Sequence, residues 1–212
     1  MLSPPRELFI KGAVDLWYLS TENTALSLYH TFLSAEEQAE VEGVRHLPTR
    51  HLMLLGRALV RLVLSEYAPL EPSQWKILRS PYGKPYVDSK QSALHFNVAH
   101  AEGLVVCGVS ATSALGVDVE RTDQGHANLH DWTAKEAIAK GLGYGVSLPF
   151  ESILPENCAL YRVLPTPPLS SSDPLVWHVV RPEISPLYTL AVATPNTAPI
   201  GVRLRNRTVT GI

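Results

Sequence analysis

An apolar run near the middle of the chain carries two carboxylates whose spacing suits metal chemistry. The run reads "LGVDVER", residues 115–121, and its acids are Asp118 and Glu120. Side chains two positions apart on a β-strand point to the same face, so these two should lie side by side. Glu136 follows in a stretch with a helical pattern and adds a third acid. Three carboxylates with no cluster of Cys or His nearby favour Mg²⁺ over Zn²⁺.

The same three acids also have a simpler interpretation. Asp118 and Glu120 would then lie on a solvated face of a sheet, and Glu136 would pair only with Lys140, four residues further on. Such a helical pair contributes a few tenths of a kcal/mol, roughly 0.2–0.5. On spacing alone, this simpler interpretation is the favoured one.

Three further features would suit a phosphate-containing ligand. Lys140 lies one helical turn after the third acid, where its ammonium could neutralise a departing phosphate. His100 ends "HFNVAH", which we predict to be a strand. Arg79 and Lys84 flank a tight turn in "RSPYGKP", where Gly83 lets the backbone come close to a ligand. Each feature taken singly also has a purely structural explanation.

Composition and alternation predict the elements that must hold these groups. The predicted strands are rich in β-branched and apolar residues and cover 14–19, 75–80, 94–100, 104–110, 115–120, 176–180 and 188–194. Three helices are expected, one starting after Ser34, one with Pro48 in its first turn, and one capped by Asp131. The second, within 46–68, should be the longest. Its core-facing stripe is expected to be Leu52, Leu55, Leu59, Leu62 and Val63.

A basic patch accompanies this long helix. Arg50, Arg57 and Arg61 fall away from the centre of its apolar stripe. Arg57 and Arg61 are one turn apart, so we expect them to be able to share an anionic ligand.

The order of the elements predicts an α+β fold of two halves. A strand, helices and strands come first, and strands, a helix and strands follow. We expect the halves to meet near residue 98. The last segment, 196–212, shows no helical period and is expected to be a tail or an edge strand.

Composition places the chain among ordinary globular proteins. Its 212 residues, 45% of them hydrophobic, suffice for one large domain or two small ones. A net charge of −2 argues against nucleic acid as a partner. We find neither a membrane-length apolar run nor a secretory signal pattern, so we predict a cytoplasmic protein with no membrane partner. Cys107 and Cys158 should then be free thiols of the core.

Four segments, taken together and in order, resemble a known enzyme family. "RSPYGKP", "FNVAH", "GVDVE" and "WTAKEAIAKGLGYG" are similar, one after another, to the sequence blocks of the 4′-phosphopantetheinyl transferases of the Sfp type. The resemblance extends to "LYTLAVAT", nearly the whole chain. It implies two similar α+β halves related by a pseudo-twofold axis, with coenzyme A and Mg²⁺ in the cleft between them. Residues 1–98 would then bind coenzyme A, 99–195 would hold the metal, and 196–212 would be a variable tail.

The implied reaction transfers the phosphopantetheine arm of coenzyme A to a serine of an acyl or peptidyl carrier protein. By resemblance, Asp118, Glu120 and Glu136 match the ligands of Mg²⁺, and Glu136 is also a candidate general base. Lys140 resembles the lysine that assists the leaving group, and His100 resembles a histidine that contacts a phosphate of the coenzyme; both would be catalytic and coenzyme-binding. The remaining matches to coenzyme A-binding segments are Arg50, Arg79, Lys84 and Pro85.

Three departures from the family pattern accompany the resemblance. Ala99 stands where the block usually has a serine that could bond a phosphate, which should weaken coenzyme binding. Only ten residues, 121–130, separate the "GVDVE" strand from the next helix, where relatives usually carry a few dozen that include a candidate base. The segment after residue 195 matches no family block.

Two other hypotheses compete with an active transferase. One is a catalytically weak paralogue that binds coenzyme A or a carrier protein without efficient transfer. The other is an unrelated Mg²⁺-dependent enzyme acting on nucleotides or phosphoesters. The pathway, whether fatty-acid, polyketide or nonribosomal peptide synthesis, is not evident from the sequence. An internally duplicated fold would complete its site without a second copy, so a monomer is expected.

Overall fold

Two sheets and a short ribbon organise the computed structural model, which describes residues 13–22, 24–124, 128–195 and 200–207. The first sheet has the strand order β11-β1-β5-β4, the second has β6-β10-β9-β8-β7, and β2 pairs with β3. The strands are β1 (Ala13–Ser20), β2 (Ile77–Arg79), β3 (Pro85–Val87), β4 (His95–Ala101), β5 (Leu104–Ser110), β6 (Gly116–Arg121), β7 (Ile153–Pro155), β8 (Leu160–Val163), β9 (Val176–Val180), β10 (Tyr188–Thr194) and β11 (Gly201–Asn206). The α-helices are α1 (Leu26–His30), α2 (Ala35–Glu42), α3 (Leu47–Ser65) and α4 (Leu129–Leu142).

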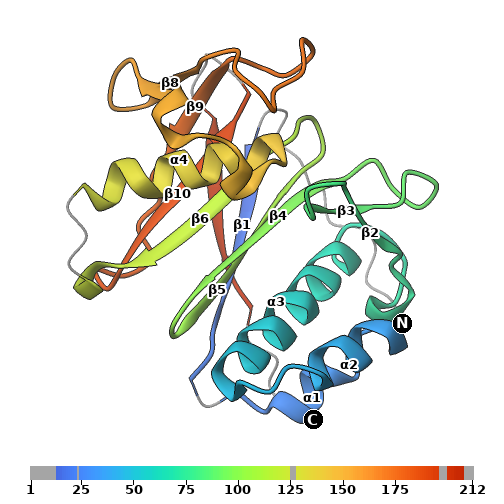
Figure 1. Ribbon diagram of the computed structural model, residues 1–212. Helices are drawn as coiled ribbons and strands as arrows, with labels where there is room; N and C mark the ends of the chain where they lie inside the picture. The colour runs from blue at the N-terminus through green and yellow to red at the C-terminus, as the bar shows by residue number, and fades with distance from the viewer. Residues whose placement is uncertain (1–12, 23, 125–127, 196–199, 208–212) are drawn as a thin grey trace.

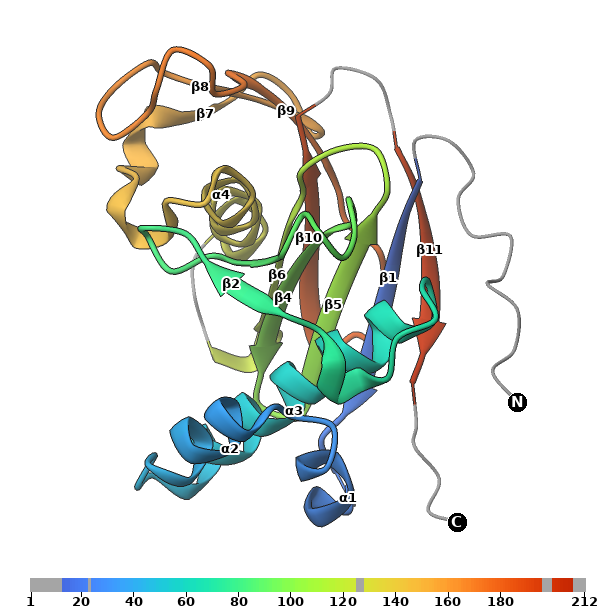
Figure 2. The same cartoon turned by 90° about the vertical axis from the view of Figure 1, so that its right-hand side faces the viewer.

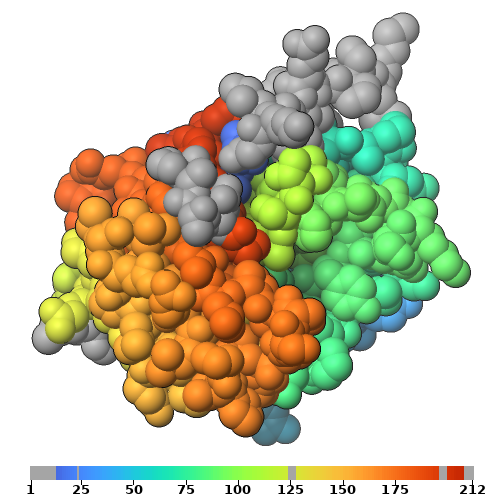
Figure 3. All heavy atoms as spheres, turned by 90° about the horizontal axis from the view of Figure 1, so that it is seen from above, coloured from blue at the N-terminus to red at the C-terminus, as the bar shows by residue number. Residues whose placement is uncertain are grey.

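The helices cover different sheets. Helices α1, α2 and α3 lie on the side of the first sheet, whereas α4 lies against the second (Figure 1, Figure 2). One apolar cluster packs α3 against the first sheet, a second packs α4 against the second sheet, and a third fills the space between the sheets. Seen from above, the green residues around the β2–β3 ribbon and the orange residues between α4 and β10 lie on opposite sides of the molecule (Figure 3). The α+β class predicted from the order of elements is confirmed.

Most elements lie where local sequence signals place them. The seven predicted strands correspond to β1, β2, β4, β5, β6, β9 and β10. Ser34 caps α2 in a capping box with Glu37, and α3 is the longest helix among the described residues. The predicted core stripe of α3 is buried except at Leu52, which is only partly covered.

Several expectations need correction. Asp131 does not cap α4: Asn128 is the N-cap, and Asp131 lies inside the first turn, where it pairs with Lys135. The short strands β3, β7 and β8 and the short helix α1 carry too few residues for a periodic signal, and the sequence did not predict them. Cys107 and Cys158 are free thiols, but Cys158 is exposed rather than part of the core.

Arg61 is a structural residue rather than a ligand-binding one. It is buried, its Nε donates to Oε2 of Glu37 at 2.6 Å, and its Nη1 donates to the carbonyls of Pro72 and Trp75 at 2.8 and 2.9 Å. Helix α2 and the turn after α3 cover this side of the helix. The expectation that Arg61 shares an anionic ligand with Arg57 is therefore wrong.

The segment after residue 195 contains an edge strand of the first sheet, which confirms one of the two alternatives predicted for it. Strand β11 pairs in parallel with β1, from Ala13 opposite Gly201 to Tyr18 opposite Asn206. Its Arg203 donates from Nε and Nη2 to the two carboxylate oxygens of Asp15, at 2.6 and 2.8 Å. Asp15 is 1% exposed, so β11 supplies the counter-charge of a buried carboxylate.

Removing this counter-charge should destabilise the fold. Arg203→Met leaves the buried side chain of Asp15 without its counter-charge, which we expect to lower the free energy of unfolding by about 3–5 kcal/mol. Urea unfolding measures it, with Arg205→Met on the same strand as the control. The double variant Asp15→Asn/Arg203→Met should recover part of the loss. A cost below about 1 kcal/mol for Arg203→Met would contradict this account.

The two sheets meet where β4 and β6 run side by side (Figure 1). The side chain of Asn97 on β4 accepts a hydrogen bond at 2.8 Å from the backbone N–H of Val117 on β6. Asn97 is buried, so this bond ties the sheets together away from solvent.

Among the described helices, none has the length and apolar character needed to span a membrane.

Candidate metal and phosphate site

The three acids singled out in the sequence lie together. Asp118 and Glu120 are on β6, opposite Ala191 and Thr189 of β10, and they share one face of the strand. Glu136 reaches them from α4, and one carboxylate oxygen from each acid lies within 4.8 Å of those of the other two. The predicted cluster is therefore present in the fold.

A very close packing of α4 on β6 brings the acids together. A side-chain carbon at Gly116 would lie 1.7 Å from the carbonyl oxygen of Ala137 and 2.5 Å from the backbone nitrogen of Gly141. No residue with a side chain fits at Gly116 without moving the helix. A glycine at the start of β6 thus permits the approach that lets Glu136 face Asp118.

Lys140 completes the cluster as its positive member. Its Nζ contacts Oδ1 of Asp118 and lies 3.4 Å from Oε2 of Glu136. Burial opposes the charged form of Lys140, but the carboxylates of Asp118 and Glu136 outweigh it, so its pKa is raised. Lys140 is therefore an ammonium throughout the neutral pH range.

Asp118 is the most unusual member of the cluster. Its burial, reinforced by the charges of Glu136 and Glu120 and opposed by Lys140, raises its pKa to about 7. Its second oxygen, Oδ2, is buried and has no hydrogen-bond partner among the described residues. An orphaned carboxylate oxygen in a group of three acids and one ammonium is what a divalent cation with oxygen ligands would satisfy. The residues present therefore fit Mg²⁺.

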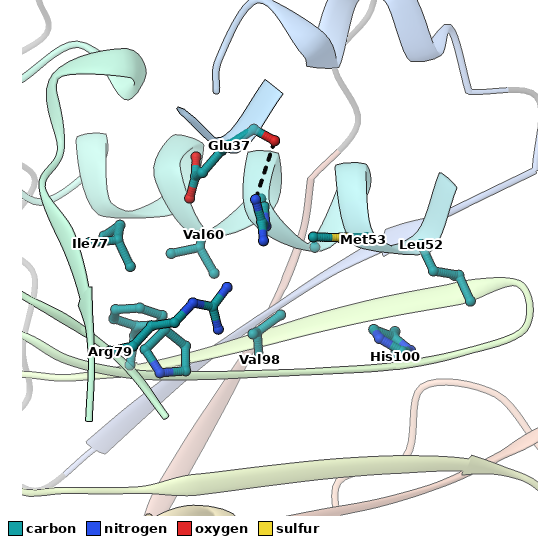
Figure 4. A pocket seen from close by; sticks show the side chains of 12 residues that line it. Glu37, Leu52, Met53, Val60, Ile77, Arg79, Val98 and His100 are labelled. Carbon is teal, nitrogen blue, oxygen red and sulfur yellow. Dashed lines mark hydrogen bonds between the residues drawn. The ribbon is translucent and has the colours of Figure 1, made fainter. Parts of the chain in front are cut away.

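A cavity of about 260 Å³ opens between α3 and β4, in the first half of the chain. Figure 4 shows it with Arg79 and His100 on the strand side and Glu37 on the helix side. Its floor is apolar and includes Leu52, Val60 and Val98. Such a lining, with few polar groups at its edge, is typical of a small-molecule site.

His100 is neutral at neutral pH in this setting. Partial desolvation of the imidazole and the charge of Lys140 lower its pKa. It can then donate one hydrogen bond to a ligand without adding charge.

The residues matched to coenzyme A-binding segments do not all lie at the cavity. Arg79, Pro85 and His100 line the cavity, whereas the described lining does not include Arg50 or Lys84. Arg50 donates from Nε to the carbonyl of Val44 at 2.7 Å, and the ammonium of Lys84 donates to two backbone carbonyls. Both cations are engaged by the chain itself.

Two residues, Glu37 and Asn97, were missed in the sequence. Glu37 lines the cavity beside Arg57, which was expected to face a ligand, and the carbonyl of Glu37 accepts from Nη1 of Arg57 at 3.2 Å. Asn97 was overlooked as the tie between the sheets. A polar side chain at an inward position of the apolar run "HFNVAH" is a signal that could have identified it.

Comparison with known proteins gives a consistent result. Residues 17–114 match a family model described as "4′-phosphopantetheinyl transferase, N-terminal". The 4′-phosphopantetheinyl transferase Sfp of Bacillus subtilis is 28% identical over 150 residues, which cover 58% of this chain and 66% of Sfp.

Two cyanobacterial proteins are also similar. The Synechocystis protein slr0495, which is named for the same activity, is 28% identical over 195 residues, covering 78% of each chain. The 4′-phosphopantetheinyl transferase HetI of Nostoc is 29% identical over 121 residues, covering 55% of this chain and 51% of HetI. The matched part thus spans between about half and about four fifths of these relatives. The sequence blocks, the family model and these relatives agree: the chain is similar to proteins of the 4′-phosphopantetheinyl transferase family, which supports a transferase of this type.

Proposed function

We propose that the protein is a Mg²⁺-dependent transferase that moves the phosphopantetheine arm of coenzyme A to a serine of an acyl or peptidyl carrier protein, converting the apo form to the holo form. The observation that carries the proposal is the cluster of Asp118, Glu120, Glu136 and Lys140 in a chain similar to proteins of this family. It joins three oxygen donors to an ammonium, the combination that transfer of a phosphate group requires.

In this proposal the acids hold the ion and the ammonium serves the leaving group. Asp118, Glu120 and Glu136 would hold Mg²⁺, with Oδ2 of Asp118 as a ligand that has no competing partner within the described chain. When bound there, Mg²⁺ would offset the charge of the pyrophosphate. Lys140 donates toward the phosphate oxygen that gains charge as the bond to the leaving group breaks.

The proton of the attacking serine needs an acceptor within this site. Glu136 is the candidate base, because its carboxylate lies beside the other acids on an accessible side of α4. It would accept the hydroxyl proton as the serine oxygen attacks the phosphorus next to the pantetheine arm. The other product is adenosine 3′,5′-bisphosphate.

The cavity beside α3 would receive the adenosine end of coenzyme A. Its apolar floor suits a nucleobase, and Arg79 and His100 stand at its edge for a phosphate. Arg79 is exposed, and within the described part of the chain its guanidinium donates one long hydrogen bond, 3.3 Å, to the carbonyl of Gly83, which leaves donors for an anion. Pro85 supports the same wall.

We also propose that the fold consists of two related halves with the site between them. The two sheets share a strand order. In the first, β1 pairs with β5 and β5 with β4; in the second, β6 pairs with β10 and β10 with β9. In both, an early strand of the half is followed in the sheet by a late strand and then by the strand that precedes that late strand in the chain. Each half also packs one main helix, α3 or α4, on its sheet. Residue 98 lies inside β4, so the strand pairing favours a division between Ser110 and Gly116. A cytoplasmic, monomeric protein remains a prediction.

Mass spectrometry of a carrier protein tests the proposed activity. An apo acyl or peptidyl carrier protein, incubated with this protein, coenzyme A and Mg²⁺, should gain one phosphopantetheine, and EDTA should prevent the gain. No gain with several carriers would overturn the proposal. Binding of coenzyme A without transfer would then point to the weak paralogue.

A further inference from the structure

We infer that Lys84 is a positioning residue whose ammonium fastens the β2–β3 turn to the place where β6 crosses α4, and thereby fixes the acids of the site relative to one another. The inference deepens the proposed function and rests on it for its kinetic test. It assigns Lys84 a different role from the coenzyme contact expected from its motif.

The ammonium of Lys84 makes two hydrogen bonds to backbone carbonyls. Nζ donates to the carbonyl of Gly141 at 2.7 Å and to that of Leu115 at 3.2 Å. Gly141 lies in the last turn of α4, where carbonyls lack partners within the helix and the helix dipole is negative. Leu115 is the buried residue that leads into β6. One cation therefore joins the end of the helix to the start of the strand.

These two carbonyls flank the closest approach of α4 to β6. Gly116, directly after Leu115, leaves no room for a side chain between the strand and the backbone of Gly141. Along the chain from this crossing, Asp118 follows Leu115 by three residues and Glu136 precedes Gly141 by five. A slip of the helix at the crossing would move Glu136 and Lys140 away from Asp118.

The backbone of Lys84 is fixed within the β2–β3 turn. Its carbonyl accepts from the N–H of Ser80 at 2.9 Å, its N–H donates to Oγ of Ser80 at 3.1 Å, and Gly83 supplies a φ of +85° in the turn. Tyr82 of the same turn packs edge-on against Tyr144 beyond α4, with ring centroids 4.9 Å apart. The turn is thus docked on the end of α4 by an aromatic pair as well as by the ammonium.

The stem of Lys84 also packs against this helix end. A side-chain carbon at Gly143, the C-cap of α4, would lie 3.4 Å from Cδ of Lys84. Burial lowers the pKa of Lys84 to about 8, as expected for an ammonium that has lost most of its water. Together these contacts describe a side chain used to hold the fold rather than one left free for a ligand.

The test compares Lys84→Met with Lys84→Arg, which keeps the charge and donors, and with Lys76→Met as a surface control. Lys76 has a side chain that is 65% exposed and pairs with Asp88 at 3.2 Å. Three quantities are measured: hydrogen exchange of the amides at 116–118 and 141–144, affinity for Mg²⁺ alone by calorimetry, and kcat and KM for coenzyme A.

A positioning role predicts a specific combination of results. Lys84→Met should exchange these amides faster, bind Mg²⁺ about 10-fold more weakly and lose about 10-fold or more in kcat, with KM for coenzyme A changed by less than about threefold. Lys84→Arg should recover part of each loss, and Lys76→Met should change none of them. If Lys84→Met does not fold, Lys84→Gln, which keeps a shorter donor, takes its place.

The opposite pattern would overturn the inference. A KM for coenzyme A raised more than about 10-fold, with unchanged amide exchange and Mg²⁺ affinity, would make Lys84 a coenzyme ligand. Unchanged values of all three would remove both roles. If the unmodified protein shows no transfer, the proposed function fails, whereas amide exchange and Mg²⁺ affinity still decide the role of Lys84.

Discussion

Asp118→Asn should abolish Mg²⁺-dependent transfer and at the same time raise the thermal stability of the metal-free protein. Removing the buried carboxylate takes away the oxygen donor best placed for the ion, so we expect kcat/KM to fall by at least about 10³-fold. Asparagine keeps a carbonyl oxygen that can still accept from Lys140, so the packing around the site should persist. Loss of activity is thus separated from loss of fold.

The gain in stability follows from the raised pKa of Asp118. Its pKa is about 7 in the folded chain against an ordinary value of 3.8, so the folded state holds the proton more tightly than the unfolded state. Above pH 7 the ionised, buried carboxylate costs free energy of folding. This cost shrinks as the pH falls from 7 towards 4, because the folded protein then gains the proton first. The advantage of Asn over Asp should therefore be largest near pH 8 and small near pH 5.

Thermal unfolding in EDTA at pH 8 and pH 5 measures this difference. For a chain of this size, each kcal/mol of stabilisation raises Tm by about 2–4 °C, so a shift of several degrees at pH 8 is expected. Glu151→Gln, which removes one exposed negative charge away from the site, is the control. A lower Tm for Asp118→Asn at pH 8, or a gap that widens at pH 5, would contradict the account.

Local signals in the sequence were enough to predict the elements that carry the site. Alternation predicts β6, and one residue between Asp118 and Glu120 places both on one face. Helical spacing predicts α4 and puts Lys140 one turn after Glu136. That the two elements lie together came from resemblance to the family, because no local signal reports which helix packs on which strand.

The roles of the cations depend on contacts between distant parts of the chain, and here local reasoning failed. Arg61 was expected to face a ligand, but Glu37, Pro72 and Trp75, 24, 11 and 14 residues away, cover it. Lys84 meets carbonyls 31 and 57 residues further on. For the last segment the sequence left a tail and an edge strand open, and only the pairing of β11 with β1, at the opposite end of the chain, decides for the edge strand.

These distant contacts also show how the fold serves the site. Three links hold the first sheet and its ribbon to the elements that carry the acids: Lys84 to Gly141, Asn97 to Val117, and Tyr82 to Tyr144. If coenzyme A is held mainly by the first half and Mg²⁺ by the second, these links set the distance between the nucleotide and the metal. A transferase of this kind depends on that distance, because its chemistry consists mainly of positioning and charge stabilisation.

Lys140→Met should lower kcat by about 10²–10³-fold with little change in KM for coenzyme A. The ammonium of Lys140 already faces Asp118 and Glu136, so it adds little to binding of the ground state. Its interaction strengthens as the departing phosphate gains charge, which affects kcat rather than affinity. Steady-state kinetics on a carrier protein measure both quantities, with Lys135→Met on the same helix as the control.

Affinity for Mg²⁺ distinguishes Lys140 from Lys84. Removing the positive charge of Lys140 leaves three carboxylates without their internal partner, so Lys140→Met should bind Mg²⁺ at least as tightly as the unmodified protein. Lys84→Met should bind it more weakly, because the acids lose their relative position while Lys140 still competes for them. Substitution of either lysine would thus lower kcat, but the two substitutions would change the affinity for Mg²⁺ in opposite directions. A raised KM with unchanged kcat in Lys140→Met would instead make Lys140 a binding residue, and weaker Mg²⁺ binding there would show that its charge organises the acids rather than competing with the ion.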